Sequence, residues 1–232
     1  MGSEMCIRDS SCSHAALGIQ VLKDEMASFT NDPEWVHIIE RAVALHSDFR
    51  LPSGLSAREL LFCAITRDAD KVDILRVFNQ SSCEAVLGID PSEFSHGEIS
   101  DVAFEAFDER RCLARDERPG SLDGLVGAAC LAFELELPAS RKALGDRGYL
   151  QALLREPFGL SPHFESELTQ YRWNAICDVM QGLAFDFRPG IESEDPHKRL
   201  MNRLDCSAAE LNSEAYVDGG IFLDSLLERY DA

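Results

Sequence analysis

The chain has 232 residues, of which 45% are hydrophobic and 27% charged, and this composition excludes global disorder and the low-complexity or fibrous classes. Its formal net charge of −19 repels phosphate backbones, so we expect no nucleic-acid partner. No apolar run reaches the ~18–20 residues of a membrane span, and the eight cysteines form no CxxC pair. We therefore expect a cytoplasmic protein with no membrane partner.

Residues 1–11 differ from the rest of the chain. They show no periodicity, and they resemble translated adaptor sequence rather than a signal peptide, which would contain an apolar stretch. We expect this leader to be non-native. In that case we expect the true start of the protein to be missing from the sequence.

From residue 14 onward, apolar residues recur at helical spacing. The first predicted helix covers 14–29. Asp32 and Pro33 then provide the cap and the first position of a second helix. That helix carries one apolar stripe and ends at His46, which is expected on the buried face.

The third predicted helix begins with the capping-box spacing of Ser56 and Glu59 and runs to about residue 78. It is apolar on more than one side, so we expect it to be the central helix. Further helices are predicted at 81–87, 99–108, 123–136, 140–155, 162–184 and 207–228, with a polar linker at 187–206. No strand alternation persists, and the predicted fold class is an all-α helical bundle.

Two of these later helices carry expectations about burial. The helix at 123–136 is apolar nearly all round and should be buried. We interpret Phe164, Tyr171 and Trp173 as core or helix packing. The helix at 162–184 aligns on one face Phe164, Leu168, Tyr171, Ala175, Val179 and Leu183.

Three side chains on successive helices are candidate metal ligands: His14, His46 and Asp70. Imidazole and carboxylate together suit Mn, Fe, Ni, Zn or Co, and a carboxylate also suits Mg. A carboxylate in a central helix carries a free-energy penalty unless it is paired or binds a metal. Asp68 and Asp70 lie ~200° apart around the helix, so only one of them can face a given site.

The order and spacing of these residues resemble the second half of HD-domain metal-dependent phosphohydrolases. The resemblance consists of His14-Ala-Ala-Leu-Gly18, a helix that ends at His46, and Arg67-Asp-Ala-Asp70-Lys-Val-Asp73. It implies that His14, His46 and Asp70 bind a divalent metal ion. It also implies a partial HD-like helical domain at 12–155, followed by a helical extension at 156–232 with the linker near 187–206.

The resemblance to this family implies that the function is metal-dependent hydrolysis of a small phosphate ester. One or two ions lower the pKa of a bound water and neutralise charge on the phosphoryl oxygens. Arg67 and Lys71 are candidate contacts for the substrate phosphate. We favour the simpler interpretation, in which they pair with Asp68 or Asp73.

The chain departs from the family because no histidine precedes His14, whereas the family places a histidine and a His-Asp pair there. Truncation is the preferred explanation, and a degenerate family member is the other. In both cases we expect the chain to bind a metal ion weakly and to be inactive. The alternative function is a non-catalytic HD-like module that binds a nucleotide or a protein, and a purely structural helical protein is a third. No sequence feature sets the substrate or the oligomeric state.

The remaining candidates have structural interpretations. His37, His96, His163 and His197 are expected at the surface. Cys63 lies on a buried helix with no recognisable base beside it, so a nucleophile role is not expected.

Overall fold

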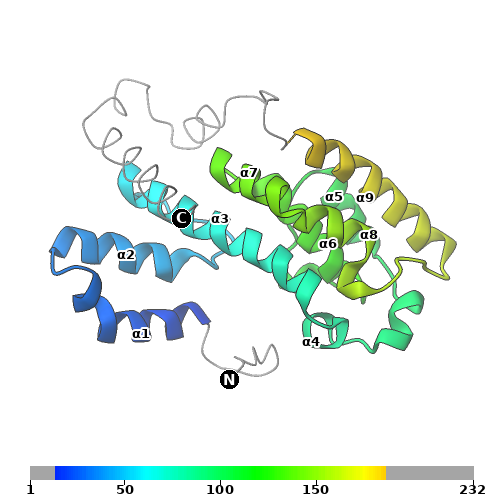
Figure 1. Cartoon of the computed structure of the whole chain (residues 1–232), viewed down its shortest axis with the longest axis horizontal. Coiled ribbons are helices and arrows are strands. Elements are labelled where there is room, and N and C mark those ends of the chain that lie inside the picture. The colour runs from blue at the N-terminus through cyan, green and yellow to red at the C-terminus, as the bar shows by residue number, and fades with distance from the viewer. Residues whose placement is uncertain (1–13, 187–232) are drawn as a thin grey trace.

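The structure is a computed structural model that describes residues 14–186 (Figure 1). The predicted leader, the linker at 187–206 and the helix at 207–228 lie outside the described residues. Within residues 14–186 all regular elements are helices and none is a strand, which confirms the all-α prediction for that part. No helix in the same range is long and apolar enough to cross a membrane.

The first three helices begin and end close to where their capping signals predict. They are α1 (His14–Phe29), α2 (Pro33–Leu45) and α3 (Ala57–Gln80). Asp32 accepts a hydrogen bond from the backbone N–H of Glu34, and Ser56 and Glu59 form the reciprocal capping box. α1 and α2 form an antiparallel hairpin, and the long α3 runs from this hairpin into the rest of the molecule (Figure 1).

The remaining helices are shorter than α3 and surround its second half. Two predicted helices are divided: the one at 140–155 breaks at Gly148, and the one at 123–136 changes to 3₁₀ geometry after Cys130. Gly148 has φ +66°, the left-handed conformation that ends a helix at low steric cost. The observed elements are α4 (Cys83–Leu87), α5 (Asp101–Asp108), α6 (Asp123–Cys130), α7 (Pro138–Arg147), α8 (Tyr149–Arg155) and α9 (Glu167–Asp186), with 3₁₀ turns η1 (Pro91–His96), η2 (Arg115–Glu117), η3 (Leu131–Glu134) and η4 (Pro157–Gly159).

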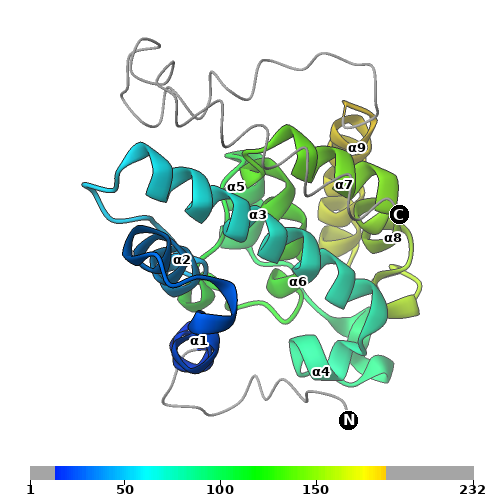
Figure 2. The same ribbon diagram turned by 60° about the vertical axis from the view of Figure 1, so that its left-hand side comes forward.

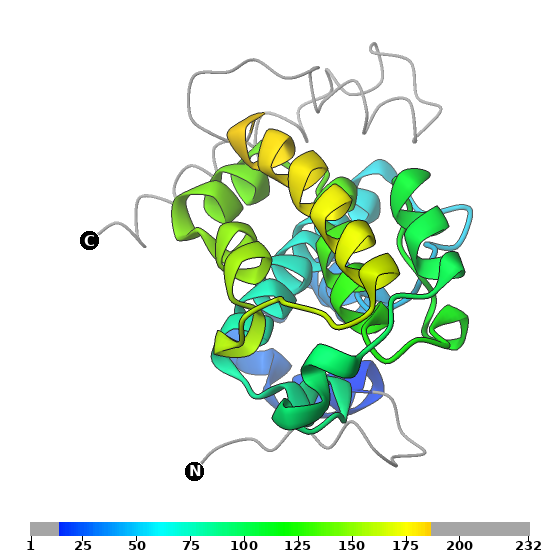
Figure 3. The ribbon, with the colours of Figure 1, turned by 90° about the vertical axis from the view of Figure 1, so that its right-hand side faces the viewer.

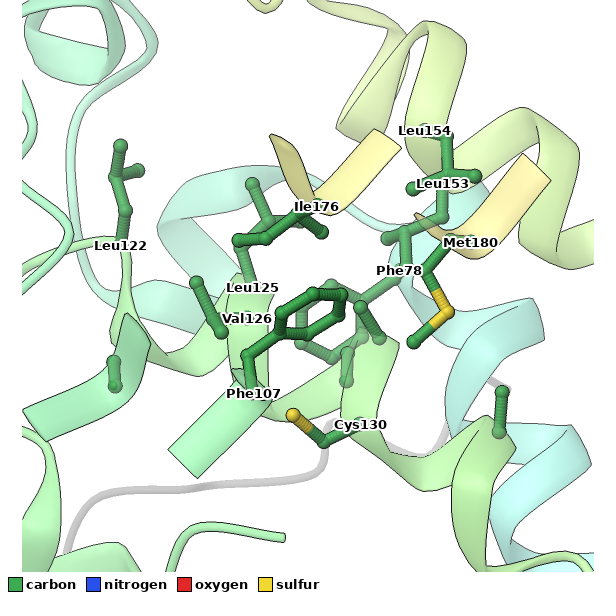
Figure 4. Close-up of a cluster of buried hydrophobic side chains, with 14 of the residues drawn as sticks. Phe78, Phe107, Leu122, Leu125, Val126, Cys130, Leu153, Leu154, Ile176 and Met180 are labelled. Atoms are coloured by element: carbon green, nitrogen blue, oxygen red, sulfur yellow. The ribbon is translucent and has the colours of Figure 1, made fainter. Parts of the chain in front are cut away.

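The main hydrophobic core lies around α6, between the second half of α3 and α5, α8 and α9. Every residue of α6 from Leu125 to Cys130 is buried, as its all-round apolar pattern predicts. Phe107 of α5 and Ile176 and Met180 of α9 converge on it (Figure 4). In Figure 3, α9 lies in front of this core and covers it on the viewer's side.

The predicted apolar face of the last described helix is wrong for three of its members, while Phe164 is buried and Leu183 packs against the core. α9 buries Thr169, Trp173, Ile176 and Met180. The predicted members Leu168, Tyr171 and Val179 are exposed instead. Both faces have helical spacing, but the face with Trp173 and Met180 removes more apolar area from water, and that area decides the orientation.

A buried carboxylate ties the centre of α3 to the start of α7. The side chain of Asp68 is fully buried and accepts hydrogen bonds from the backbone N–H groups of Glu136 (3.0 Å) and Leu137 (2.8 Å). The Lys71 ammonium lies 3.7 Å from the same carboxylate and donates to the carbonyl oxygen of Glu134 (2.9 Å). The charge of Asp68 is therefore offset by two backbone donors and one cation.

We predict that Asp68→Ala lowers the free energy of unfolding by about 3 kcal/mol, because two buried N–H groups lose their acceptor and a buried ammonium loses its counter-charge. Urea unfolding followed by circular dichroism measures this change. The control is Asp73→Ala on the same helix, whose exposed carboxylate pairs only with Arg76 among the described residues. Its effect should stay within about 0.5 kcal/mol, and equal midpoints for the two variants would contradict the role given to Asp68.

Candidate metal centre

The three predicted ligands lie on three helices that pack in sequence. His14 is the first residue of α1, His46 follows the last residue of α2, and Asp70 lies in the middle of α3. α1 packs against α2, and α2 packs against α3 (Figure 2). The side chain of His14 lies outside the described part of the chain, so only its backbone locates this residue.

The contact between Gly18 and Val43 places the start of α1 beside the end of α2. A Cβ atom built on Gly18 would lie 3.4 Å from Cγ1 of Val43. Gly18 is four residues after His14, on the same side of α1, and Val43 is three residues before His46. The two histidines therefore occupy the same end of the helical hairpin.

Arg67 places α3 at this same end. Its guanidinium donates hydrogen bonds to the carbonyl oxygens of Leu45 (3.2 Å) and His46 (3.5 Å), and also to that of Asp48. Arg67 precedes Asp70 by one helical turn. The turns that bear the three predicted ligands thus meet at one end of the α1–α2–α3 layer.

The imidazole of His46 is held by its own helix. Its Nδ1 atom lies 2.7 Å from the carbonyl oxygen of Val43, and the side chain is half-buried. Because a carbonyl oxygen only accepts, Nδ1 carries the proton, and in the neutral ring the lone pair is on Nε2. A histidine that binds a metal through one nitrogen usually donates the other N–H to a carbonyl or carboxylate, so His46 has the arrangement of an Nε2 ligand.

Asp70 differs from Asp68 in its surroundings. Asp70 is half-buried, and within the described residues its carboxylate has no hydrogen-bond or ion-pair partner. Because the two residues are ~200° apart around α3, Asp70 faces away from the side on which Asp68 meets α7. Asp73 does not support Asp70, since its carboxylate pairs with Arg76 (2.6 Å). A half-buried carboxylate with no partner among the described residues is suited to binding a cation.

The two cations predicted to contact substrate are engaged within the fold. Lys71 is buried and pairs with Asp68, as the favoured interpretation predicts, and it also lies 3.7 Å from the Glu134 carboxylate. Arg67 binds backbone carbonyls at the end of α2 instead of Asp68 or Asp73, so that half of the favoured pairing is wrong. A contact with substrate phosphate stays a prediction for both residues.

Sequence reasoning did not identify Glu134 and Arg141 as members of the polar network beside α3. Arg141 is buried and donates from Nε and Nη2 to the carbonyl oxygen of Leu135. Glu134 and Lys71 are far apart in the sequence, so no local pattern predicts that they pair. Only the fold brings them together.

The cysteine thiols in the described region are not activated. Cys63 is fully buried, and burial raises the pKa of its thiol. Burial likewise raises the pKa of Cys130 to about 12 and that of Cys177 to about 11. These thiols stay protonated near neutral pH, which supports the prediction that Cys63 is not a nucleophile.

Among the described side chains, no group of three or more His, Cys, Asp and Glu residues is placed to hold a metal ion. The predicted set includes His14, whose side chain is not described, so His46 and Asp70 are the members that the structure describes in full. Comparison with family models, with curated proteins and with solved structures finds no match.

We predict that His46 carries its proton on Nδ1 when the ring is neutral. Long-range ¹H–¹⁵N correlation at about pH 8, where an imidazole is neutral, distinguishes the two tautomers. His37 is a matched control, because its Nε2 atom lies 3.1 Å from a carboxylate oxygen of Glu59 and should carry the proton there. The Nε2–H tautomer at His46 would remove the ligand assignment.

Proposed function

We propose that this chain contributes His14, His46 and Asp70 to the metal centre of an HD-type metal-dependent phosphohydrolase. The observation that carries the proposal is that the start of α1 packs on the end of α2, and that the end of α2 is bound by the middle of α3. Gly18 packs on Val43, and Arg67 binds the carbonyl oxygens of Leu45 and His46. These contacts support the convergence that the resemblance implies.

The donor chemistry fits a divalent ion. The set would offer two imidazoles and one carboxylate, which suit Mn, Fe, Ni, Zn or Co better than Mg. The hydrogen bond from Nδ1 of His46 to Val43 supports a ligand role, and so does the carboxylate of Asp70, which has no partner within residues 14–186. When bound, the ion would supply Lewis-acid chemistry at the phosphoryl group of a small ester.

The set of ligands in this chain is incomplete relative to the family. Residues 1–13 contain no histidine, so the first histidine and the His-Asp pair implied by the resemblance are not supplied there. Three ligands hold a divalent ion less firmly than the full set. We therefore expect this chain, tested as it stands, to bind metal weakly and to have no turnover on phosphate esters.

A second candidate function is a non-catalytic HD-like module that binds a nucleotide or a protein. It is favoured by the internal engagement of Arg67 and Lys71, which leaves both cations occupied by partners within the fold. The five cysteines in the described part are free thiols, which supports a cytoplasmic location under either function.

We predict that the chain binds Mn²⁺ saturably and that Asp70→Asn weakens this binding at least ~10-fold, since even second-shell partners are worth that much. Electron paramagnetic resonance of free Mn²⁺ measures the affinity, and hydrolysis of p-nitrophenyl phosphate measures turnover, which is expected to be absent.

The matched control is Asp73→Asn, one turn away on α3, where the carboxylate is exposed and paired with Arg76. It should leave Mn²⁺ affinity unchanged. An equal loss of affinity in the two variants would show general electrostatic attraction by an acidic surface. No binding by the unchanged chain would favour the non-catalytic module.

A further inference from the structure

Arg67 has an unusual set of partners for a charged residue in a chain this acidic. Its guanidinium binds three carbonyl oxygens around the end of α2, those of Leu45, His46 and Asp48, and it makes no carboxylate pair among the described residues. The side chain is half-buried between α2 and α3. Arg67 therefore joins the two helices through the backbone and not through an ion pair.

The chemistry of a helix end explains why this site suits an arginine. The last carbonyl groups of a helix have no N–H partner within the helix, and they carry the negative end of its dipole. A guanidinium offers five donors in a rigid planar fork and a delocalised positive charge. All three hydrogen bonds come from Nη1 of Arg67, which reaches the backbone on both sides of His46, whereas the side chain of a lysine is one bond shorter.

Two of the proposed ligands depend on this contact. The backbone of His46 is held by Arg67, and the imidazole is held by the carbonyl of Val43. Asp70 follows Arg67 by one turn of the same rigid helix. In the same turn of α3, Asp68 and Lys71 fix the helix against η3 and the start of α7. The relative placement of His46 and Asp70 is thus set by the contacts that Arg67, Asp68 and Lys71 make with the neighbouring elements.

We propose that Arg67 is a positioning residue, which sets the separation of His46 and Asp70 by clamping the end of α2 to α3. The inference rests on the proposed metal centre, and it replaces a contact between Arg67 and substrate phosphate. A misplacement of one ligand lowers metal affinity even when both ligands are present.

The test compares Arg67→Lys and Arg67→Gln with the unchanged chain, and Arg76→Gln serves as the control. Arg76 lies on the same helix and binds Asp73 and Gln80 at the surface. Both Arg67 variants should weaken Mn²⁺ binding ~10-fold, and lysine should not rescue it, because its Nζ atom ends one bond short of the position of Nη1. Arg76→Gln should leave the affinity unchanged.

A second readout needs no metal. In ¹H–¹⁵N spectra of the metal-free protein, both Arg67 variants should shift the ring and amide resonances of His46 and speed amide exchange after the last turn of α2. Arg76→Gln should do neither. If Arg67→Gln does not fold, Arg67→Lys carries the comparison.

The outcomes separate the two proposals. Wild-type affinity in Arg67→Lys, or unchanged His46 resonances in both Arg67 variants, would overturn the positioning role. Shifted His46 resonances without any Mn²⁺ binding by the unchanged chain would overturn the metal centre and leave the clamp as a purely structural contact.

Discussion

The turn of α3 from Arg67 to Lys71 is the constraint on which the arrangement of the molecule depends. Successive residues of a helix point ~100° apart, so the polar side chains of this turn reach different neighbours. Arg67 holds the end of α2, while Asp68 and Lys71 hold η3 and the start of α7. Asp70 faces away from the side that meets α7. One turn thereby joins the hairpin to the main core and presents one carboxylate that has no partner among the described residues.

Local signals made the first three helices predictable. The caps at Asp32 and Ser56 act within a few residues, so the sequence contains all the information about where α2 and α3 begin. The orientation of α9 was not predictable in this way, because Trp173 and Tyr171 both lie on apolar stripes. Only the shape of the core determines which stripe is buried, and it buries Trp173 and exposes Tyr171.

Beside the candidate centre, the sequence did not predict the contacts that the polar residues of α3 make. It identified Asp70 as the carboxylate in need of a partner, whereas the buried carboxylate is Asp68, whose donors lie 68 and 69 residues away in the chain. It treated Arg67 as a side chain for phosphate or carboxylate. Its partners are backbone carbonyl groups. Every residue has such a group, so no pattern in the sequence predicts this contact.

The central claim is that His46 and Asp70 share one metal ion. Crystals of the chain soaked in Mn²⁺ test it directly through the anomalous scattering of the metal. The account predicts an anomalous peak within coordination distance of both Nε2 of His46 and the carboxylate of Asp70. A structure at saturating Mn²⁺ that has both side chains ordered and no peak between them would contradict the account.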